Sequence, residues 1–267
     1  MDTRDITILR IVDGLWETYE WVPVIEIKER ITWRIRFNQH IKQLEKLGLI
    51  GYNTSTYGEP AVKITERGLD TLAVWDFKKH GVIDDIGNVI GEGKEAVIVS
   101  AVRNDTPLAI KFHKYYSAEF HRIKRSLSYA VINWWRKRIG REMRPIDFPR
   151  AKAQIEYHSL KELHGSVNVP EPLGINRHAI VMEFIGDTVS APLLSKVKKE
   201  AWMKKEILED YQRALDKGII HGDLSAFNVM VWDKLYLIDW PQSIPTDFKS
   251  ADEMIKRDRK NIAKAFT

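Results

Sequence analysis

Apolar positions in the first eighty residues recur first with the spacing of helices and then with that of strands. Between Asp5 and Thr18 they fall three or four residues apart, as on the buried face of a helix. Further along, two short apolar runs flank a polar turn that contains Gly58, the pattern of a β-hairpin. The elements expected here are helices at 5–18, 24–30 and 34–47, strands at 49–52 and 61–64, and a helix that begins at Thr65. This order predicts a winged helix-turn-helix over residues 1–80.

Beyond a short junction at 81–87, strand-like apolar runs alternate with helical periodicity. Gly218 is expected to end the helix predicted at 199–217. The expected elements are a glycine-bearing hairpin at 89–99, a strand at 107–112, helices at 151–160 and 199–217, a strand at 179–186, and a second hairpin formed by 229–232 and 235–238. The overall prediction is an α+β chain of two domains, 1–80 and 81–267.

The segment from His221 to Asn228 reads His-Gly-Asp-Leu-Ser-Ala-Phe-Asn, and Asp239 follows eleven residues later, after an apolar run. The hairpin between them would bring Asn228 and Asp239 side by side. Phosphoryl transfer needs a carboxylate near the attacking oxygen and oxygen ligands for a magnesium ion on the triphosphate. We therefore predict that Asp223 orients the nucleophile and that Asn228 and Asp239 bind the metal. A polar turn between core elements, with Asp223 as a cap, is the structural alternative.

The glycine-bearing hairpin upstream is a candidate phosphate-binding loop. Gly91 and Gly93 would let backbone amides of the turn, up to Glu95, approach phosphate oxygens, and Lys94 could add charge. The loop is not a Walker motif, because Glu95 occupies the position of the magnesium-binding hydroxyl. A plain hairpin turn would also explain these glycines.

Lys111 lies within the apolar strand that follows, where a lysine is commonly an edge residue whose amine reaches solvent. After a glycine-bearing hairpin, however, it matches the kinase lysine that contacts nucleotide phosphates and pairs with a helical glutamate. Glu156 in the next predicted helix is either that partner or an ordinary exposed carboxylate. The later strand would place Met182, Glu183 and Ile185 along an adenine site. These parts occur in the order that a two-lobed kinase requires.

Six blocks, GEGKEA, AIKF, EYHSL, VMEFIG, HGDLSAFN and LIDWPQS, resemble the RIO family of atypical serine/threonine protein kinases, and the N-terminal pattern resembles its second, winged-helix-containing subfamily. The resemblance implies a bilobal domain with a small lobe at about 81–182, a hinge at about 182–186 and a large lobe at about 187–267. Gly222 in place of arginine, and Asp-Trp-Pro at Asp239, separate the chain from ordinary protein kinases. Since 28 residues follow Asp239, we expect neither an activation segment nor the helices that bind a peptide substrate.

This resemblance implies an ATP-dependent kinase and ATPase that uses Mg²⁺ or Mn²⁺, phosphorylates itself, and acts in maturation of the small ribosomal subunit. It also implies that Asp239 itself can accept the γ-phosphoryl group. Ala96 and Ala226 replace a serine and an acidic residue that are common in the family. Because an alanine side chain cannot make the polar interaction of either residue, we expect slow turnover.

A precursor of the small ribosomal subunit and its RNA are the partners that the resemblance implies. Residues 111–144 contain ten basic and two acidic residues, interleaved with tyrosine and tryptophan, although the whole chain has a net charge of only +5. This composition suits RNA, or else a solvated loop whose aromatic residues pack on the small lobe. Candidate self-phosphorylation sites in it are Ser117, Ser126 and Ser128. The third predicted helix offers side chains for phosphates and base edges, or simply a solvated face: Arg34, Arg36, Asn38, Gln39, His40, Lys42 and Lys46.

Composition narrows the possible chemistry and the possible cellular location of the protein. The absence of cysteine excludes disulfides and thiol chemistry, and fits either a reducing cytoplasm or a heat-adapted organism. No apolar run approaches the length of a membrane span. We expect a cytoplasmic protein without a membrane partner, and favour a monomer. One rival function is a small-molecule phosphotransferase of the aminoglycoside or choline kinase type, which needs a larger helical lobe. The other is a nucleic-acid-binding regulator with an inactive kinase domain, against which the intact Lys111, Asp223, Asn228 and Asp239 argue.

Overall fold

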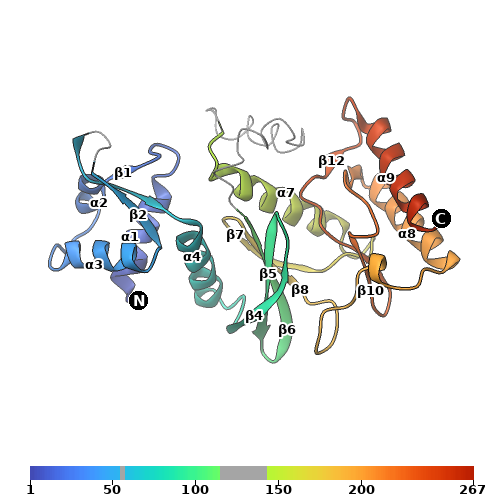
Figure 1. Cartoon of the computed structure of the whole chain (residues 1–267), viewed down its shortest axis with the longest axis horizontal. Coiled ribbons are helices and arrows are strands. Elements are labelled where there is room, and N and C mark those ends of the chain that lie inside the picture. Colours follow the sequence, from blue (N-terminus) through green and yellow to red (C-terminus); the bar gives the residue numbers. More distant parts are fainter. Residues whose placement is uncertain (55–57, 115–142) are drawn as a thin grey trace. The chain divides into compact units, whose positions relative to one another are not determined.

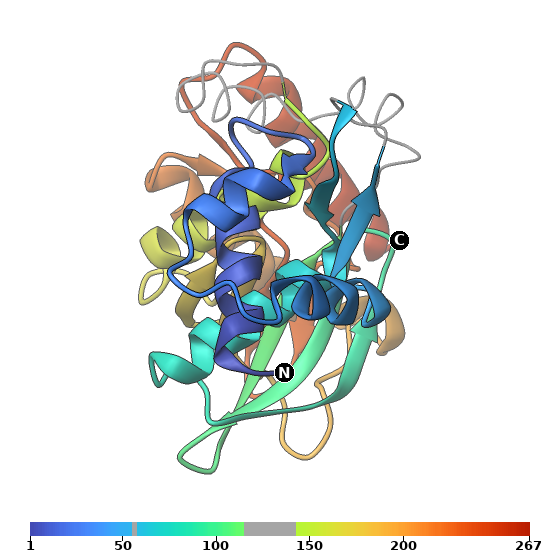
Figure 2. The ribbon, with the colours of Figure 1, turned by 90° about the vertical axis from the view of Figure 1, so that its left-hand side faces the viewer.

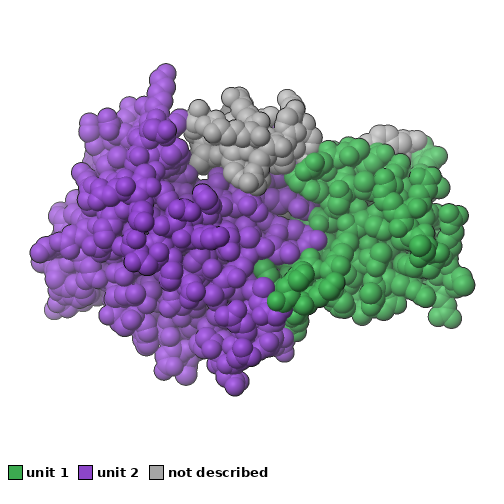
Figure 3. Space-filling model, turned by 180° about the vertical axis from the view of Figure 1, so that it is seen from behind, with its two compact units in different colours: residues 1–80 green, residues 81–267 purple. Residues whose placement is uncertain are grey.

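The computed structural model describes residues 1–54, 58–114 and 143–267 of the chain. The chain divides into two compact units, Met1–His80 and Gly81–Thr267 (Figure 3). Each unit buries its own set of apolar side chains. Over the described ranges, no helix is both long enough and apolar enough to cross a lipid bilayer.

Unit 1 combines helices with a small antiparallel sheet (Figure 2). The strands are ordered β1-β3-β2, and α1 packs against α4 and β3. Leu9, Leu44 and Leu72, from three different helices, are fully buried, which accounts for the apolar periodicity. The elements are α1 (Thr3–Gly14), β1 (Val22–Pro23), α2 (Val24–Glu29), α3 (Phe37–Lys46), β2 (Ile50–Asn53), β3 (Ala61–Ile64) and α4 (Glu66–Lys79).

Two of the helix boundaries in unit 1 differ from the prediction by three residues or more. The helix expected to begin at Arg34 begins at Phe37, because Arg36 adopts the left-handed backbone conformation with φ of 63°. The helix expected to reach Thr18 ends at Gly14, and the chain continues in turns. Hydrophobic periodicity reports which face of a helix is buried, but it carries no signal for a single left-handed residue.

Unit 2 begins with a five-stranded antiparallel sheet in the order β4-β5-β6-β8-β7. α7 (Asp147–Leu163) packs against β6, β7 and β8 (Figure 1). The strands are β4 (Asp85–Glu92), β5 (Ala96–Arg103), β6 (Thr106–His113), β7 (Pro172–Asn176) and β8 (Ala179–Glu183). The predicted glycine-bearing hairpin and the lysine-bearing strand are confirmed. β7 was not predicted, since proline, glycine and asparagine within its five residues disfavour a strand.

The rest of unit 2 combines helices with two pairs of short strands. Tyr211, Trp240 and Ile262 are fully buried in one apolar core that joins its helices to the β10–β11 hairpin. The elements are η2 (Leu194–Lys196), α8 (Ala201–Asp216), β9 (Ile219–Ile220), β10 (Val229–Val231), β11 (Leu235–Leu237), β12 (Ile244–Pro245) and α9 (Ala251–Ala265). β10 pairs with β11 and β9 with β12. The hydrophobic pattern did not predict α9, because most of its positions are polar or charged.

Candidate active site

All twelve residues predicted for nucleotide binding, metal binding and catalysis line one cavity of about 840 Å³ in unit 2. Its walls come from the β4–β5 turn, β6, α7, the segment around the end of β8, and the loops on either side of the β10–β11 hairpin. The residues are Gly91, Gly93, Lys94, Glu95, Lys111, Glu156, Met182, Glu183, Ile185, Asp223, Asn228 and Asp239.

Lys111 joins two carboxylates from distant parts of the chain. Its Nζ donates to Glu156 Oε1 on α7 and to Asp239 Oδ1 after β11, each at 2.6 Å. Burial acts to lower the pKa of Lys111, but the two carboxylates outweigh it and raise the pKa. Burial likewise acts to raise the pKa of Glu156, yet Lys111 and His113 hold it below the ordinary value. The amine is therefore a permanent cation at the cavity wall, and the Glu156 partnership that we predicted is present.

Asp239 is turned toward the cavity by its backbone. Its φ is 67°, in the left-handed region, while the next side chain, Trp240, is fully buried and donates from its indole nitrogen to Leu237 O at 3.0 Å. The Asp239 side chain keeps 42% of its surface exposed. Burial of the carboxyl acts to raise its pKa, but Lys111 prevails and lowers the pKa to about 2. The Asp239 carboxylate is consequently ionised at neutral pH, so its oxygens can act as ligands of a cation.

The second hairpin brings the predicted metal ligands together. β10 and β11 pair Val229 with Leu237, and Ile238 N donates to Asn228 O at 3.0 Å, so Asn228 lies beside the strand end that precedes Asp239. The Asn228 Nδ2 donates to Asp223 O at 2.8 Å. With its amide nitrogen used in this way, the Asn228 side chain has an oxygen to offer a cation.

The backbone of the loop His221–Asn228 explains why glycine occupies position 222, where ordinary protein kinases have arginine. Gly222 has φ of 81°, and a Cβ there would approach Gln242 O to 2.5 Å. Asp223 follows it, exposed to the cavity. Partial burial of the Asp223 carboxyl raises its pKa, the neighbouring His221 acts to lower it, and the nearby charge of Asp239 adds to the increase. A carboxylate with a raised pKa is suited to accepting a hydrogen bond from a hydroxyl nucleophile.

Asp258 on α9 is a site residue that sequence reasoning missed. It is fully buried, and its carboxylate accepts hydrogen bonds from Gly222 N at 2.9 Å and Leu224 N at 3.2 Å, the amides on either side of Asp223. Tyr211 donates to the same carboxylate at 2.8 Å, and Arg257 donates to Gly222 O. Had α9 been predicted, the position of Asp258 on its buried face would have indicated a candidate site residue.

The β4–β5 turn fits a phosphate-binding role. A Cβ at Gly93 would meet only Ala96 O, at 3.8 Å, so the glycine position opens onto space that a ligand can approach. Lys114 holds the turn by donating to Glu92 at 2.8 Å and to Gly93 O at 2.9 Å. Glu95 forms an ion pair with Lys152 on α7. The negative charge of the Glu95 carboxylate is thus balanced by a lysine of the protein itself.

The predicted nucleic-acid-binding residues of unit 1 all lie at the surface, apart from His40, but they do not share one helix. Asn38, Gln39 and Lys42 are exposed positions of α3, whereas Arg34 and Arg36 belong to the turn before it.

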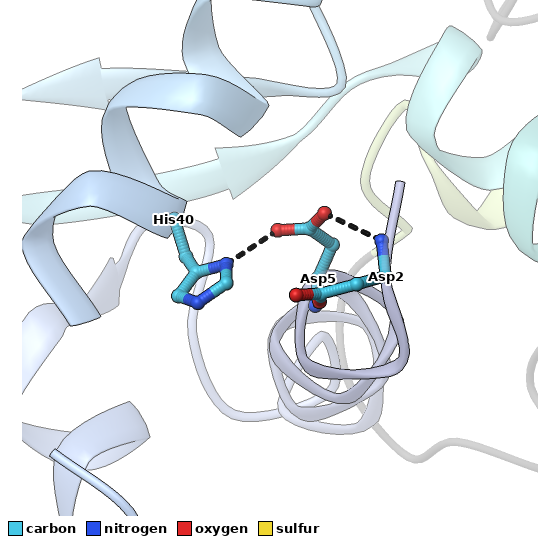
Figure 4. A group of neighbouring side chains, drawn as sticks. All are labelled: Asp2, Asp5 and His40. Atoms are coloured by element: carbon cyan, nitrogen blue, oxygen red, sulfur yellow. Dashed lines mark hydrogen bonds and ion pairs between the residues drawn. The ribbon is translucent and has the colours of Figure 1, made fainter. Parts of the chain in front are cut away.

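The prediction that His40 faces nucleic acid is wrong. It is buried, and its Nδ1 lies 2.8 Å from Asp5 Oδ1 (Figure 4). Asp5 also accepts from Asp2 N at 3.0 Å, while Asp2 caps α1. The ligand atoms of these three side chains lie within 4.8 Å of one another, as in a cation site, but their hydrogen bonds to one another and to the helix start already account for their arrangement.

The basic and aromatic segment between Lys114 and Met143 lies outside the described residues. The candidate self-phosphorylation sites Ser117, Ser126 and Ser128 fall within it and remain predictions.

Comparison with known proteins gives consistent matches. Residues 96–267 match the RIO domain. The chain is 33% identical to RIO-type serine/threonine-protein kinase Rio2 of Methanocaldococcus jannaschii, over 93% of this chain and 90% of that protein. It is 27% identical to serine/threonine-protein kinase RIO2 of Saccharomyces cerevisiae, covering all of this chain and 64% of the yeast protein.

A solved structure matches the fold. The structure of the Rio2 kinase–ADP/Mg²⁺–phosphoaspartate complex from Chaetomium thermophilum superimposes with a TM-score of 0.82 and 24% identity, covering all of this chain and 80% of that one. At this identity the match describes the arrangement of elements, which the two chains share.

Proposed function

Because this chain belongs to the RIO family of atypical serine/threonine protein kinases, we propose that its cavity binds ATP with Mg²⁺ or Mn²⁺ and catalyses phosphoryl transfer and ATP hydrolysis. One observation carries the proposal. The buried Lys111 amine lies between Glu156 and Asp239, 2.6 Å from each, in the same cavity as Asp223 and Asn228. A cation, two oxygen ligands and an independent carboxylate are the groups that phosphoryl transfer requires.

The donor set fits a divalent cation of the magnesium class. Asp239 supplies an ionised carboxylate and Asn228 an amide oxygen, the oxygen ligands that such cations prefer. When bound, the cation neutralises charge on the phosphates. Lys111 supplies a positive charge beside them, and the backbone of the turn from Gly91 to Glu95 offers amide donors.

Asp223 is the residue that we propose to orient the attacking hydroxyl or water. Its backbone is held on both sides by Asp258, so the carboxylate projects from a fixed loop. Met182, Glu183 and Ile185 would contact the adenine. Ile185 is itself held by its carbonyl, which accepts from Ala191 N at 2.9 Å.

We further propose that Asp239 accepts the γ-phosphoryl group. In this step an Asp239 oxygen forms a bond to the γ-phosphorus, the bond to the ADP oxygen breaks, and water later releases inorganic phosphate. Ionisation and exposure of the Asp239 carboxylate support this role, and the Chaetomium thermophilum relative was solved with phosphoaspartate. After exposure to labelled ATP, the wild type should carry a hydroxylamine-sensitive label that Asp239→Asn lacks. Label that resists hydroxylamine would instead indicate autophosphorylation of serine or threonine.

For the whole protein we propose a cytoplasmic, monomeric factor in maturation of the small ribosomal subunit. The helix, hairpin and helix order of unit 1 supports a winged helix-turn-helix, and Arg34, Arg36 and Lys42 at its surface suit an RNA backbone. Binding of the full chain to small-subunit RNA, compared with a variant in which these three residues are glutamine, tests this part.

The first experiment is magnesium-dependent ATP hydrolysis by the wild type and Asp223→Ala, each with and without purified small-subunit particles. Hydrolysis that requires Asp223 and Mg²⁺ and changes with the particles is the expected result. Phosphorylation of an aminoglycoside or choline instead would favour the small-molecule phosphotransferase. Specific DNA binding without any ATP turnover would favour the inactive regulator.

A further inference from the structure

His113 is a buried residue of the cavity wall to which the roles above assign nothing. It lies two positions after Lys111 on β6, so the two side chains leave the same face of the strand. Only 1% of its surface is exposed, and it lines the same cavity as Lys111 and Glu156.

The contacts of His113 connect it to the lysine through Glu156. His113 Nε2 lies 2.8 Å from Glu156 Oε2, while the other carboxylate oxygen, Oε1, accepts from Lys111 Nζ at 2.6 Å. This 2.8 Å contact lacks the angles of a hydrogen bond, and within the described ranges neither ring nitrogen of His113 nor Glu156 Oε2 has a hydrogen-bond partner. A buried carboxylate oxygen without a donor is costly, and His113 Nε2 is close enough to become the donor of Oε2 after a small rotation of the ring.

The surrounding charges indicate which form of the imidazole makes the contact. Burial lowers the pKa of His113; Glu156 acts against this, and the positive charges of Lys111 and Lys152 add to it. The ring is therefore neutral near pH 7 and carries one N–H. The tautomer with hydrogen on Nε2 donates to Glu156, which the acceptor-only carboxylate requires.

We propose that His113 is a positioning residue that fixes the Glu156 carboxylate and, through it, aims the Lys111 amine at the nucleotide phosphates. Without a donor on Oε2, the carboxylate can rotate to offer both oxygens to Lys111. The amine would then be drawn toward α7 and away from Asp239. This inference rests on the proposed binding of ATP in the cavity.

The test compares MgATP dissociation constants, KM and kcat for the wild type, His113→Leu and His113→Gln. Leucine removes the donor but retains an apolar side chain, whereas the glutamine amide keeps an N–H near the place of Nε2. His178→Leu is the matched control. His178 is also 1% exposed and its ring lies beside that of Phe112 of β6, with centroids 5.9 Å apart, so this variant removes another buried imidazole.

We expect His113→Leu to weaken MgATP binding by about ten-fold, the effect of removing one charge-assisted hydrogen bond. His113→Gln should recover to within a few-fold of the wild type, and His178→Leu should bind MgATP like the wild type even if its unfolding temperature falls. If His113→Leu does not fold, His113→Asn, whose shorter amide cannot reach Glu156, takes its place.

Three results would overturn the inference. The first is equal MgATP affinity in the wild type and the donor-free variant. The second is a glutamine variant as weak as the leucine variant, which would mean that His113 acts by packing alone. The third is a wild type that binds no MgATP, in which case the proposed function falls as well.

Discussion

Each unit of the protein buries a carboxylate beside a histidine, yet the two groups have different surroundings. In unit 1, both oxygens of Asp5 have partners, His40 on one side and the backbone of Asp2 on the other (Figure 4). In unit 2, Glu156 shares its oxygens between His113 and Lys111, and Lys111 reaches on to Asp239 at the cavity.

The comparison shows that a buried charge is not by itself evidence of function. The Asp5 group is closed, since its hydrogen bonds end on a helix start and a neighbouring helix. The Glu156 group is open, because its chain of contacts ends at Asp239, a carboxylate whose side chain is 42% exposed. An open chain of charges can exchange a protein contact for one with a ligand, whereas a closed one can only stabilise the fold.

The largest effect should come from removing the cation of the open group. In Lys111→Met we expect ATP hydrolysis to fall at least about 100-fold, since one preorganised charge at the reacting phosphates is removed. The exposed lysine substitution Lys205→Met, at a side chain that is 80% exposed on α8, is the control and should retain wild-type turnover. Turnover of Lys111→Met within a few-fold of the wild type would remove Lys111 from the site.

A smaller effect is expected at Asp258, which supports the loop that carries Asp223 beside the open group. Asp258→Asn leaves one acceptor oxygen for two loop amides, so the loop that carries Asp223 should shift and kcat should fall about ten-fold or more, with MgATP affinity retained. The measurement is kcat beside the MgATP dissociation constant. The matched control is Asp252→Asn, an exposed position on the same helix. A loss confined to stability would show that Asp258 anchors α9 and nothing more.

Breaking the closed group of unit 1 should affect stability alone. His40→Leu leaves Asp5 without its buried side-chain partner, and we expect the free energy of unfolding to fall by about 1–3 kcal/mol. ATP hydrolysis per folded molecule should not change. Denaturant unfolding and steady-state turnover check this, with the exposed His158→Leu as control. A matching fall in turnover would mean that the closed group also serves the active site.

The smallest effect is a dependence of stability on pH that belongs to the open group. The pKa of Asp239 is about 2 in the folded protein, whereas its ordinary value is 3.8. The ionised carboxylate therefore stabilises the folded protein fully at pH values above 3.8. We expect the unfolding free energy of the wild type, relative to Asp239→Asn, to be constant near neutral pH and to decrease as pH falls from about 4 to about 2. Acid unfolding curves measure the difference. The same decrease in a Lys111→Met background would exclude Lys111 as its cause.

Sequence alone determined the order of the chemical groups and the elements that carry them. The glycine-bearing turn, Lys111, Glu156, Asp223, Asn228 and Asp239 could be identified because each lies at a characteristic position within a short local pattern. The β10–β11 hairpin is a good example. Its two apolar runs and intervening turn are local, so the pairing of Val229 with Leu237 could be anticipated.

Tertiary structure decided which of these groups touch and what supports them. Lys111 and Asp239 are 128 positions apart, and Asp258 reaches back 36 positions to Gly222. No local periodicity encodes such contacts, because they depend on how separately formed elements pack. The same reason explains the errors: His40 fits an exposed recognition face by residue type, but packing against α1 buries it on Asp5. Residue chemistry is thus readable along the chain, whereas burial and partnership are properties of the packed fold.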